Sequence, residues 1–265
     1  MSRDGRVVVS DLDGCLLDSS SYSWESAGPA LRVLKKRGIP LVLCSSKTRA
    51  EMERLHAELG LDAPYVFENG GGIVIPPGTP GSRAKRRDGG PLLVRLGVPL
   101  VELARALALI AKEAGARLRG FSRLSPRELG DITGLSPDQV KLARAREHDE
   151  PFVLESGRED EVRLAAERRG LRVTRGGRFH HLTGPVDKGK AVRQVLALLS
   201  PVHSIGLGDA ENDLPLLGAV DQPILVPRPD GSIDPALAAA FPAAGRAPAP
   251  GPSGWSSAVL LALGA

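Results

Sequence analysis

Short apolar runs alternate with helix-like segments in the first third of the chain, and this order constrains the fold most. Strand-like runs at residues 6–10, 39–44 and 65–67 alternate with amphipathic helical patterns at residues 29–37 and 48–59. Apolar runs without polar alternation are typical of parallel strands that are buried on both faces. The alternation therefore predicts a parallel sheet with helices covering both of its faces.

The same order returns near the other end of the chain, after a long interruption. From residue 188 we expect further helices and buried strands, at residues 188–199, 202–207, 214–217 and 223–226. A proline-rich tail at residues 242–254 is expected to be irregular, and a last helix is expected at residues 255–263. We predict an α/β fold in which an inserted domain splits a doubly wound, Rossmann-like core.

The segment that interrupts this alternation differs from the core in composition and in the order of its predicted elements. Residues 76–91 are rich in Gly, Pro, Arg and Lys, which indicates an exposed loop or linker. Further elements follow without regular alternation: helices at residues 99–114, 137–147 and 158–169, and strands at residues 92–96, 151–155, 171–174 and 178–182. This pattern predicts an α+β insert with its own core. We divide the chain into core residues 1–83, an inserted domain at 84–186 and core residues 187–265.

The overall composition is that of a globular protein, with 42% hydrophobic and 25% charged residues among 265. The formal net charge of +4 comes with only 3% aromatic residues and no nucleic-acid-binding motif. We therefore expect no nucleic-acid partner. A basic balance of this kind favours an anionic small-molecule substrate.

No apolar run approaches the roughly 20 residues that cross a bilayer, and the first residues lack the apolar region of a signal peptide. We expect a cytoplasmic protein without a membrane partner, and the sequence does not specify an oligomeric state. Cys15 and Cys44 lie beside apolar runs, so we expect two small buried side chains. Neither a disulfide framework nor a zinc site is expected.

Two carboxylates, Asp11 and Asp13, directly follow the first strand in the sequence Asp-Leu-Asp-Gly. Ligands of open α/β sheets bind beyond the carboxyl ends of the strands, where both side chains can approach one Mg²⁺ ion. One carboxylate can attack phosphorus, and the second can protonate the leaving group and deprotonate water. We predict that Asp11 is the nucleophile, that Asp13 is the acid–base residue and that both bind the metal. Alone, the motif is also compatible with a solvated turn.

A hydroxyl-rich segment, Ser45-Ser46-Lys47-Thr48, ends the second strand and opens a helix. Hydroxyl and backbone N–H groups at a helix N-terminus can bind phosphate, and we predict this role for Ser45 and Ser46. Simple capping of the helix by Ser46 or Thr48 is the structural alternative.

Lys188 begins the helix that resumes the core, where its ammonium group can neutralise phosphate and hold the nucleophilic carboxylate. An exposed lysine at a helix start is the structural alternative, and Lys190 is the competing candidate. We prefer Lys188, because a side chain two residues further along a helix points elsewhere.

Residues 208–213 (GDAEND) follow another buried strand. We predict that Asp209 completes the Mg²⁺ shell and that Asn212 donates to phosphate. Asp213 is expected to orient Lys188 or a metal-bound water from outside the metal shell. A polar turn capped by Asn212 or Asp213 is the alternative. Because the four motifs follow one another in order at strand ends and helix starts, they jointly predict a Mg²⁺-dependent phosphoryl-transfer site.

These four motifs resemble those of the haloacid dehalogenase superfamily of phosphotransferases, and together they span the core. The insert resembles the large type II cap of that superfamily, in its α/β subtype IIB. Cys15 stands where Thr is common in the superfamily. Four segments further resemble the mannosyl-3-phosphoglycerate phosphatase family: residues 43–51 (LCSSKTRAE), 68–72 (ENGGG), 149–155 (DEPFVLE) and 178–192 (RFHHLTGPVDKGKAV).

The family resemblance implies a phosphorylated glycoside substrate, mannosyl-3-phosphoglycerate, and hydrolysis to the compatible solute mannosylglycerate through an aspartyl-phosphate. It also implies contacts to the rest of the substrate from the rim of the core and from the cap: Lys47, Glu68, Asn69, Gly70, Arg158, Thr183 and Gly184. His180 and His181 occupy adjacent strand positions, so at most one of them is expected to face the cleft.

Three other functions are compatible with parts of this pattern. A phosphatase for the glucosyl analogue would share every motif. A phosphomannomutase-type phosphotransferase has the same core motifs and cap type, but returns the phosphoryl group to a sugar. A non-catalytic response-regulator receiver also groups acids, a hydroxyl residue and a lysine around Mg²⁺, but has no inserted domain.

Overall fold

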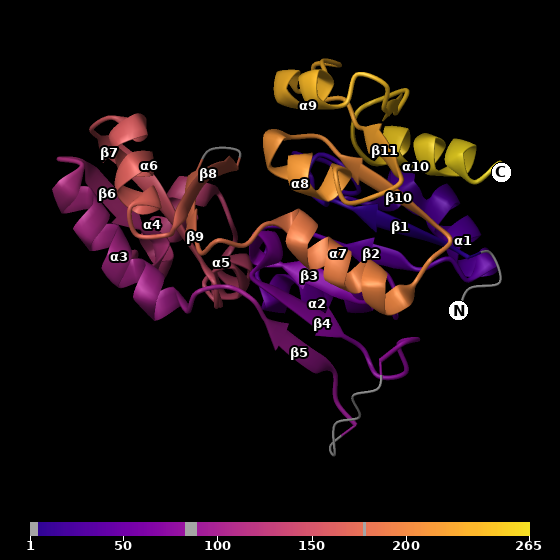
Figure 1. Cartoon of the computed structure of the whole chain (residues 1–265), viewed down its shortest axis with the longest axis horizontal. Coiled ribbons are helices and arrows are strands. Elements are labelled where there is room, and N and C mark those ends of the chain that lie inside the picture. The colour runs from indigo at the N-terminus through magenta and orange to yellow at the C-terminus, as the bar shows by residue number, and fades with distance from the viewer. Residues whose placement is uncertain (1–4, 83–88, 177–178) are drawn as a thin grey trace.

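The computed structural model describes residues 5–82, 89–176 and 179–265, which form a core and an adjoining cap (Figure 1). The core is built on a sheet of five parallel strands in the order β12-β11-β10-β1-β2. Its strands are β1 (Arg6–Ser10), β2 (Leu41–Leu43), β10 (His203–Gly208), β11 (Gln222–Leu225) and β12 (Gly245–Arg246). The predicted parallel, doubly wound core is confirmed.

Side chains of β1 alternate between two hydrophobic clusters, one on each face of this sheet. Val8 packs in a cluster with residues of α1 (Gly28–Arg37), α2 (Arg49–Glu58) and α10 (Gly251–Ala262). Val7 and Val9 pack in the opposite cluster, to which α7 (Lys188–Leu199), α8 (Leu214–Leu217) and α9 (Pro235–Ala240) contribute. Because both faces are covered, the three middle residues of β1, Val7, Val8 and Val9, are all apolar.

A second, antiparallel sheet of three strands continues the core beyond β2. It contains β3 (Tyr65–Phe67), β4 (Gly72–Ile75) and β5 (Leu92–Arg95), in that order. A parallel bridge between Cys44 and Val66 aligns it with β2. The sequence predicts that residues 92–96 belong to the insert, whereas their strand, β5, pairs with β4 of the core. The expected boundary between residues 83 and 84 lies outside the described residues, and we propose that the inserted domain begins after β5.

The cap is a four-stranded antiparallel sheet in the order β6-β7-β9-β8, with two helices on one face. Its strands are β6 (Arg117–Gly120), β7 (Asp149–Ser156), β8 (Arg172–Gly176) and β9 (Phe179–Thr183). Helices α3 (Leu100–Glu113) and α6 (Glu159–Glu167) pack against the sheet around the fully buried Phe152. The shorter helices α4 (Pro126–Thr133) and α5 (Pro137–Ala143) form a separate apolar cluster with Phe121.

Several short elements differ from the sequence-based expectation. Helix α4 was missed, although Ser125 and Glu128 form a capping box and Pro126 follows the cap. Strands β4, β6 and β12 and helix α9 were also missed, because each is too short to show a period. The prediction of an irregular tail at residues 242–254 is wrong for its last four residues, because α10 already begins at Gly251. Buried Trp255 of that helix donates to Ser10 Oγ at 2.9 Å.

The two cysteines are free and buried, as expected from their apolar surroundings. Burial raises the pKa of both thiols. Within the part of the chain that the structure describes, no helix is long and apolar enough to cross a membrane.

Candidate active site

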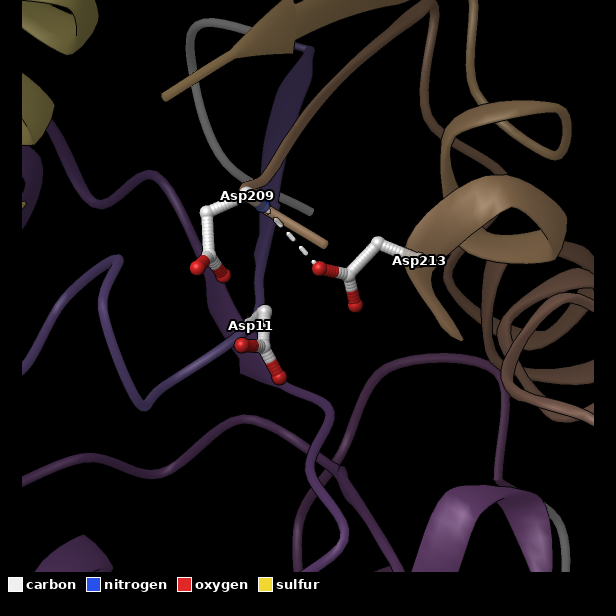
Figure 2. A group of neighbouring side chains, drawn as sticks. All are labelled: Asp11, Asp209 and Asp213. Carbon is white, nitrogen blue, oxygen red and sulfur yellow. Dashed lines mark hydrogen bonds between the residues drawn. The ribbon is translucent and has the colours of Figure 1, made fainter. Parts of the chain in front are cut away.

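The parallel sheet brings the first and the last sequence motif to one edge. Strands β1 and β10 are neighbours in parallel register, so Asp11 and Asp209 leave the sheet at the same end. The Asp11 N–H donates to the carbonyl of Leu207 at 3.0 Å, which fixes the start of the first motif. Figure 2 shows Asp11, Asp209 and Asp213 converging, and one carboxylate oxygen of each lies within 4.8 Å of the others.

Lys188 joins this acidic group from the first turn of α7. Its Nζ lies 2.6 Å from Asp11 Oδ1 and 2.6 Å from Asp213 Oδ1, and its side chain is fully buried. Burial alone would lower the pKa of Lys188, but the two carboxylates raise it well above its ordinary value. Lys190, the competing candidate, is exposed and donates to the carbonyl of Pro185. The structure therefore brings Lys188 to the nucleophile candidate and leaves Lys190 outside.

Both oxygens of Asp213 are committed to protein groups. Oδ1 accepts from Lys188, and Oδ2 accepts the backbone N–H groups of Asp209 and Ala210 at 3.0 and 3.2 Å. Asp213 is buried and is the last residue of the short helix η4 (Glu211–Asp213), which follows β10. This arrangement fits a residue that positions Lys188 and the Asp209 backbone.

Asp209 has acceptor capacity that no protein group uses. Its Oδ1 is buried and has no hydrogen-bond partner among the described residues. Burial raises the pKa of Asp209 to about 9, and the nearby charges of Asp11 and Asp213 add to the effect. Burial, followed by the charge of Asp213, likewise raises the pKa of Asp11 to about 7, although Lys188 lowers it. An all-carboxylate group with an orphaned buried oxygen fits a hard divalent cation.

Gly14 allows the first motif to approach Asp209. It has a φ of +79°, and a Cβ at this position would lie 2.6 Å from Asp209 Oδ2. Only glycine satisfies both conditions without moving the carboxylate.

Asp13 lies at the open side of the site. Its Oδ1 is 2.8 Å from Lys47 Nζ, and 38% of its side chain is exposed. Lys47 also lies over the ring of Tyr22, at 4.9 Å from its centroid. Asp13 is therefore within reach of water and of a bound ligand, as an acid–base group must be.

In the hydroxyl-rich segment at residues 45–48, one residue caps a helix and others line the cleft. Thr48 is the N-cap of α2 and forms a capping box with Glu51, so the structural alternative holds for Thr48. Ser45 is buried, and its Oγ accepts the Lys47 N–H at 3.2 Å. Ser46 and Lys47 line a large cleft above Asp11. Asn212 lines the same cleft.

The turn between β3 and β4 holds the next three predicted substrate residues, but it lies outside the cleft. Glu68, Asn69 and Gly70 all have positive φ, and Glu68 is fully buried. The Glu68 carboxylate accepts the backbone N–H groups of Glu147 and His148, which belong to the segment leading into β7. Desolvation raises the pKa of Glu68 to about 7. This residue links the core to the cap.

The remaining predicted substrate residues also lie away from the cleft. Arg158 is exposed at the start of α6 and pairs with Asp160. Thr183 is buried, and Gly184 packs closely against Val98 where the chain enters the cap. Of the residues predicted to bind the rest of the substrate, only Lys47 lines the cleft.

The cleft lies between core and cap and has a volume of about 1110 Å³. The sequence-based prediction missed most of its cap-side residues, among them Arg146, Gln139 and Arg175. It did weigh His181, which lines the cleft, whereas His180 faces α6. The period-2 alternation of β9 predicts that His180 and His181 face opposite sides of the sheet. No sequence pattern identifies Arg146, which follows the short helix α5.

Comparison with known proteins identifies the family to which the chain belongs. The chain matches a family model described as haloacid dehalogenase-like hydrolase over residues 8–79. It is 39% identical to a glucosyl-3-phosphoglycerate/mannosyl-3-phosphoglycerate phosphatase of Methanococcoides burtonii over 269 residues, 97% of each chain. It is 36% identical to the mannosyl-3-phosphoglycerate phosphatase of Pyrococcus furiosus over 83% of this chain and 90% of the relative. The chain belongs to this phosphatase family of haloacid dehalogenase-like hydrolases.

Solved structures share the whole architecture of this phosphatase, cap included. A Thermoplasma acidophilum protein superimposes with a TM-score of 0.68 at 20% identity, over 97% of this chain and 96% of the other. A sugar phosphatase of haloacid dehalogenase subclass IIB gives a TM-score of 0.67 at 14% identity, over 98% and 99%. The predicted type IIB fold is confirmed, and the chain is a phosphoric monoester hydrolase.

Proposed function

We propose that this phosphatase hydrolyses mannosyl-3-phosphoglycerate to mannosylglycerate and phosphate, with Mg²⁺ as cofactor and Asp11 as covalent nucleophile. The observation that carries the mechanism is the buried contact of Lys188 with both Asp11 and Asp213, beside the unpartnered oxygen of Asp209. The names of relatives at 36% and 39% identity support the substrate. The place of the reaction in compatible-solute synthesis in the cytoplasm is part of the same proposal.

Asp11 has one oxygen held and one oxygen available. Lys188 binds Oδ1, so Oδ2 is the atom that attacks phosphorus to give an aspartyl-phosphate. Lys188, Ser45 or the adjacent Ser46, and Asn212 stabilise the charge that spreads over the transferred phosphoryl group. Asp13 protonates the leaving glycerate oxygen, and then takes the proton of the water that hydrolyses the aspartyl-phosphate.

Asp11, Asp209 and the backbone carbonyl of Asp13 would hold the Mg²⁺ ion. When bound, the ion neutralises charge on the phosphate and on the carboxylates around it. Asp213 positions Lys188 and the Asp209 backbone and does not need to bind the ion.

A glucosyl analogue is the second candidate substrate. The relative from Methanococcoides burtonii and another from Persephonella marina, at 34% identity, are named as phosphatases for both the glucosyl and the mannosyl compound. Both compounds carry the same phosphoglycerate group, so the core site would treat them alike.

A phosphate-release assay over a panel of sugar and glycerate phosphates tests the proposal. We expect mannosyl-3-phosphoglycerate to be among the best substrates with Mg²⁺, and excess EDTA to abolish turnover. Asp11→Asn should be inactive, and normal turnover by this variant would contradict covalent catalysis. A mutase would release little phosphate from any sugar phosphate. Poor hydrolysis of the mannosyl compound alone would overturn the substrate while leaving the phosphatase chemistry intact.

A further inference from the structure

A buried carboxylate in the cap binds an arginine and a histidine side chain at the wall of the cleft. Asp149 Oδ2 lies 2.8 Å from Arg146 Nη1 and 2.8 Å from His181 Nδ1. Burial alone would raise the pKa of Asp149, but His181 and Arg146 lower it. The three residues come from the segment before β7, from the start of β7 and from β9, so the cap sheet brings them together.

The alternation of β9 turns only one of two adjacent histidines to the cleft. His181 lies opposite Pro151, and both line the cleft. His180 lies on the other face, where it stacks on Phe152 with ring centroids 5.3 Å apart and contacts Glu159. Because Asp149 accepts from His181 Nδ1, the Nε2 atom is the one left to meet a ligand. When the ring carries a proton on both nitrogens, Nε2 can donate to an anion.

Arg146 connects this cluster to the phosphate-binding segment of the core. Its Nη1 also donates to the carbonyl of Ser46 at 3.2 Å, across the boundary between cap and core. Its Nε is buried and has no hydrogen-bond partner among the described residues. A guanidinium group binds a carboxylate through two parallel N–H groups, and one edge of Arg146 is not used by Asp149 or Ser46.

The cluster of Arg146, Asp149 and His181 leaves buried polar atoms without partners, which is unfavourable if the cluster serves only to stabilise the cap. Asp149 is fully buried, and its Oδ1 has no partner among the residues described. A buried ion network with unpaired members contributes little to stability, because desolvation offsets the attraction. Arg146 and His181 both line the cleft, and their nitrogen atoms that do not contact Asp149 fit an anionic ligand.

We propose that Arg146 and His181, held by Asp149, bind the carboxylate of the substrate. This assignment rests on the proposed function, because it takes the reacting phosphate to lie at Asp11. In 3-phosphoglycerate, two carbon–carbon bonds separate the carboxylate from the carbon that bears the phosphate ester. The carboxylate must therefore lie close to the phosphate-binding segment, where Arg146 contacts Ser46. The site makes the enzyme selective for phosphorylated acids over phosphorylated alcohols.

Two substitutions of His181 separate ligand binding from support of the cap. His181→Asn places an amide N–H near the position of Nδ1, so the Asp149 contact is kept and the cleft-facing nitrogen is lost. His181→Gln does the reverse. His180→Asn is the matched control on the opposite face of the same strand. Each variant is assayed with mannosyl-3-phosphoglycerate, with its carboxamide analogue and with p-nitrophenyl phosphate, which has no carboxylate.

We expect the wild type to prefer the carboxylate over the carboxamide in kcat/KM. Losing one charge-assisted hydrogen bond should reduce this preference about 10- to 100-fold in His181→Asn, mainly through KM. His181→Gln should keep part of the preference, and His180→Asn all of it. Turnover of p-nitrophenyl phosphate should fall much less than that of mannosyl-3-phosphoglycerate in the two His181 variants, and should be unchanged in His180→Asn.

Two results would overturn the assignment. An equal loss with all three substrates would show that the cluster only supports the cap. An unchanged carboxylate preference, with a loss of discrimination between glycosylated and free 3-phosphoglycerate, would show that it binds the hexose. If the wild type does not hydrolyse the mannosyl compound, the proposed substrate fails separately. The carboxylate assignment is then tested by the preference for 3-phosphoglycerate over glycerol 3-phosphate, and the absence of a preference would overturn it.

Discussion

Lys188 and Asp11 are 177 positions apart in the sequence, yet their side chains form a buried ion pair of 2.6 Å. The pair joins the first turn of α7 to the end of β1, so it connects the two parts of the core that the cap separates. It leaves Asp11 with one oxygen oriented by the lysine and one oxygen for reaction. The same ammonium group can then meet the phosphate charge without moving far.

Replacing Lys188 with Met should damage both catalysis and stability. The change leaves two buried carboxylates, Asp11 and Asp213, without their cation, at a cost of about 3–5 kcal/mol in the free energy of unfolding. Loss of one charge-stabilising donor should lower kcat roughly 10²- to 10³-fold. Steady-state assays and denaturant unfolding measure the two effects. Lys190→Met is the control, and equal effects of the two substitutions would contradict the assignment.

Asp13→Asn should separate the two chemical steps. A nitrophenolate leaving group needs little protonation, so Asp11 should still attack p-nitrophenyl phosphate and release about one equivalent of nitrophenol in a burst. Hydrolysis of the aspartyl-phosphate needs the base, so steady-state turnover should fall roughly 10²- to 10⁴-fold. Because the side chain is partly exposed, stability should change little. Normal steady-state turnover would exclude Asp13 as the acid–base group.

The metal-free enzyme should become less stable as the pH rises. The pKa of Asp11 is about 7 and that of Asp209 about 9 in the folded protein, both above the 3.8 of a free Asp side chain. The folded state therefore binds more protons than the unfolded state between a pH of about 4 and about 9, and its stability is lost across that window. Thermal unfolding in EDTA at several pH values measures this slope.

Asp209→Asn should flatten that slope, raise the melting temperature of the metal-free protein at high pH and abolish the stabilisation by Mg²⁺. In the wild type, stabilisation by Mg²⁺ should grow with pH, because the ion needs deprotonated carboxylates. Asp131→Asn, at an exposed position of α4, should leave slope and metal response unchanged. A wild-type slope that persists in Asp209→Asn would show that other groups titrate.

Gly14→Ala should weaken metal binding through Asp209. The new Cβ would lie 2.6 Å from Asp209 Oδ2, so the carboxylate must shift away from the other ligands. Gly134→Ala is a matched control, because Gly134 has a φ of +77° but nothing within 4 Å of the Cβ position. Both variants should lose about 1 kcal/mol of stability from backbone strain, whereas only Gly14→Ala should need more Mg²⁺ for half-maximal activity. The same Mg²⁺ requirement in both variants would contradict this account.

Glu68→Ala should loosen the connection between core and cap. Its carboxylate accepts the buried N–H groups of Glu147 and His148, and each unpaired donor costs about 1–3 kcal/mol. Glu68→Gln keeps one acceptor oxygen and should cost less. Denaturant unfolding measures both losses, and exposed Glu102→Ala on α3 is the control. A loss of substrate binding at unchanged stability would instead support the role in substrate contact that the family resemblance implied.

Much of the core could be predicted because its signals are local. A few residues are enough to recognise the apolar run of β1, the start of a helix at Lys188 and the acidic turn after β10. Boundaries of α7 and α8 match the expectation residue for residue. Short elements such as β6 and α9 were missed, because four to six residues do not establish a period.

The sequence by itself determined which motifs the candidate site contains. Asp11, Ser45 and Asp209 follow strands and Lys188 begins a helix, and the order of these elements predicts a shared sheet edge. Only the tertiary structure decided the cap side of the cleft. Arg146, Asp149 and His181 come from separate segments, and their contact depends on antiparallel register that no local pattern specifies. The position of Glu68 was also decided by the tertiary structure. The family resemblance implied a substrate contact, but its buried carboxylate accepts backbone N–H groups of the segment that leads into the cap strand β7. Motifs are local in the chain, whereas a binding surface is assembled by strand pairing and burial.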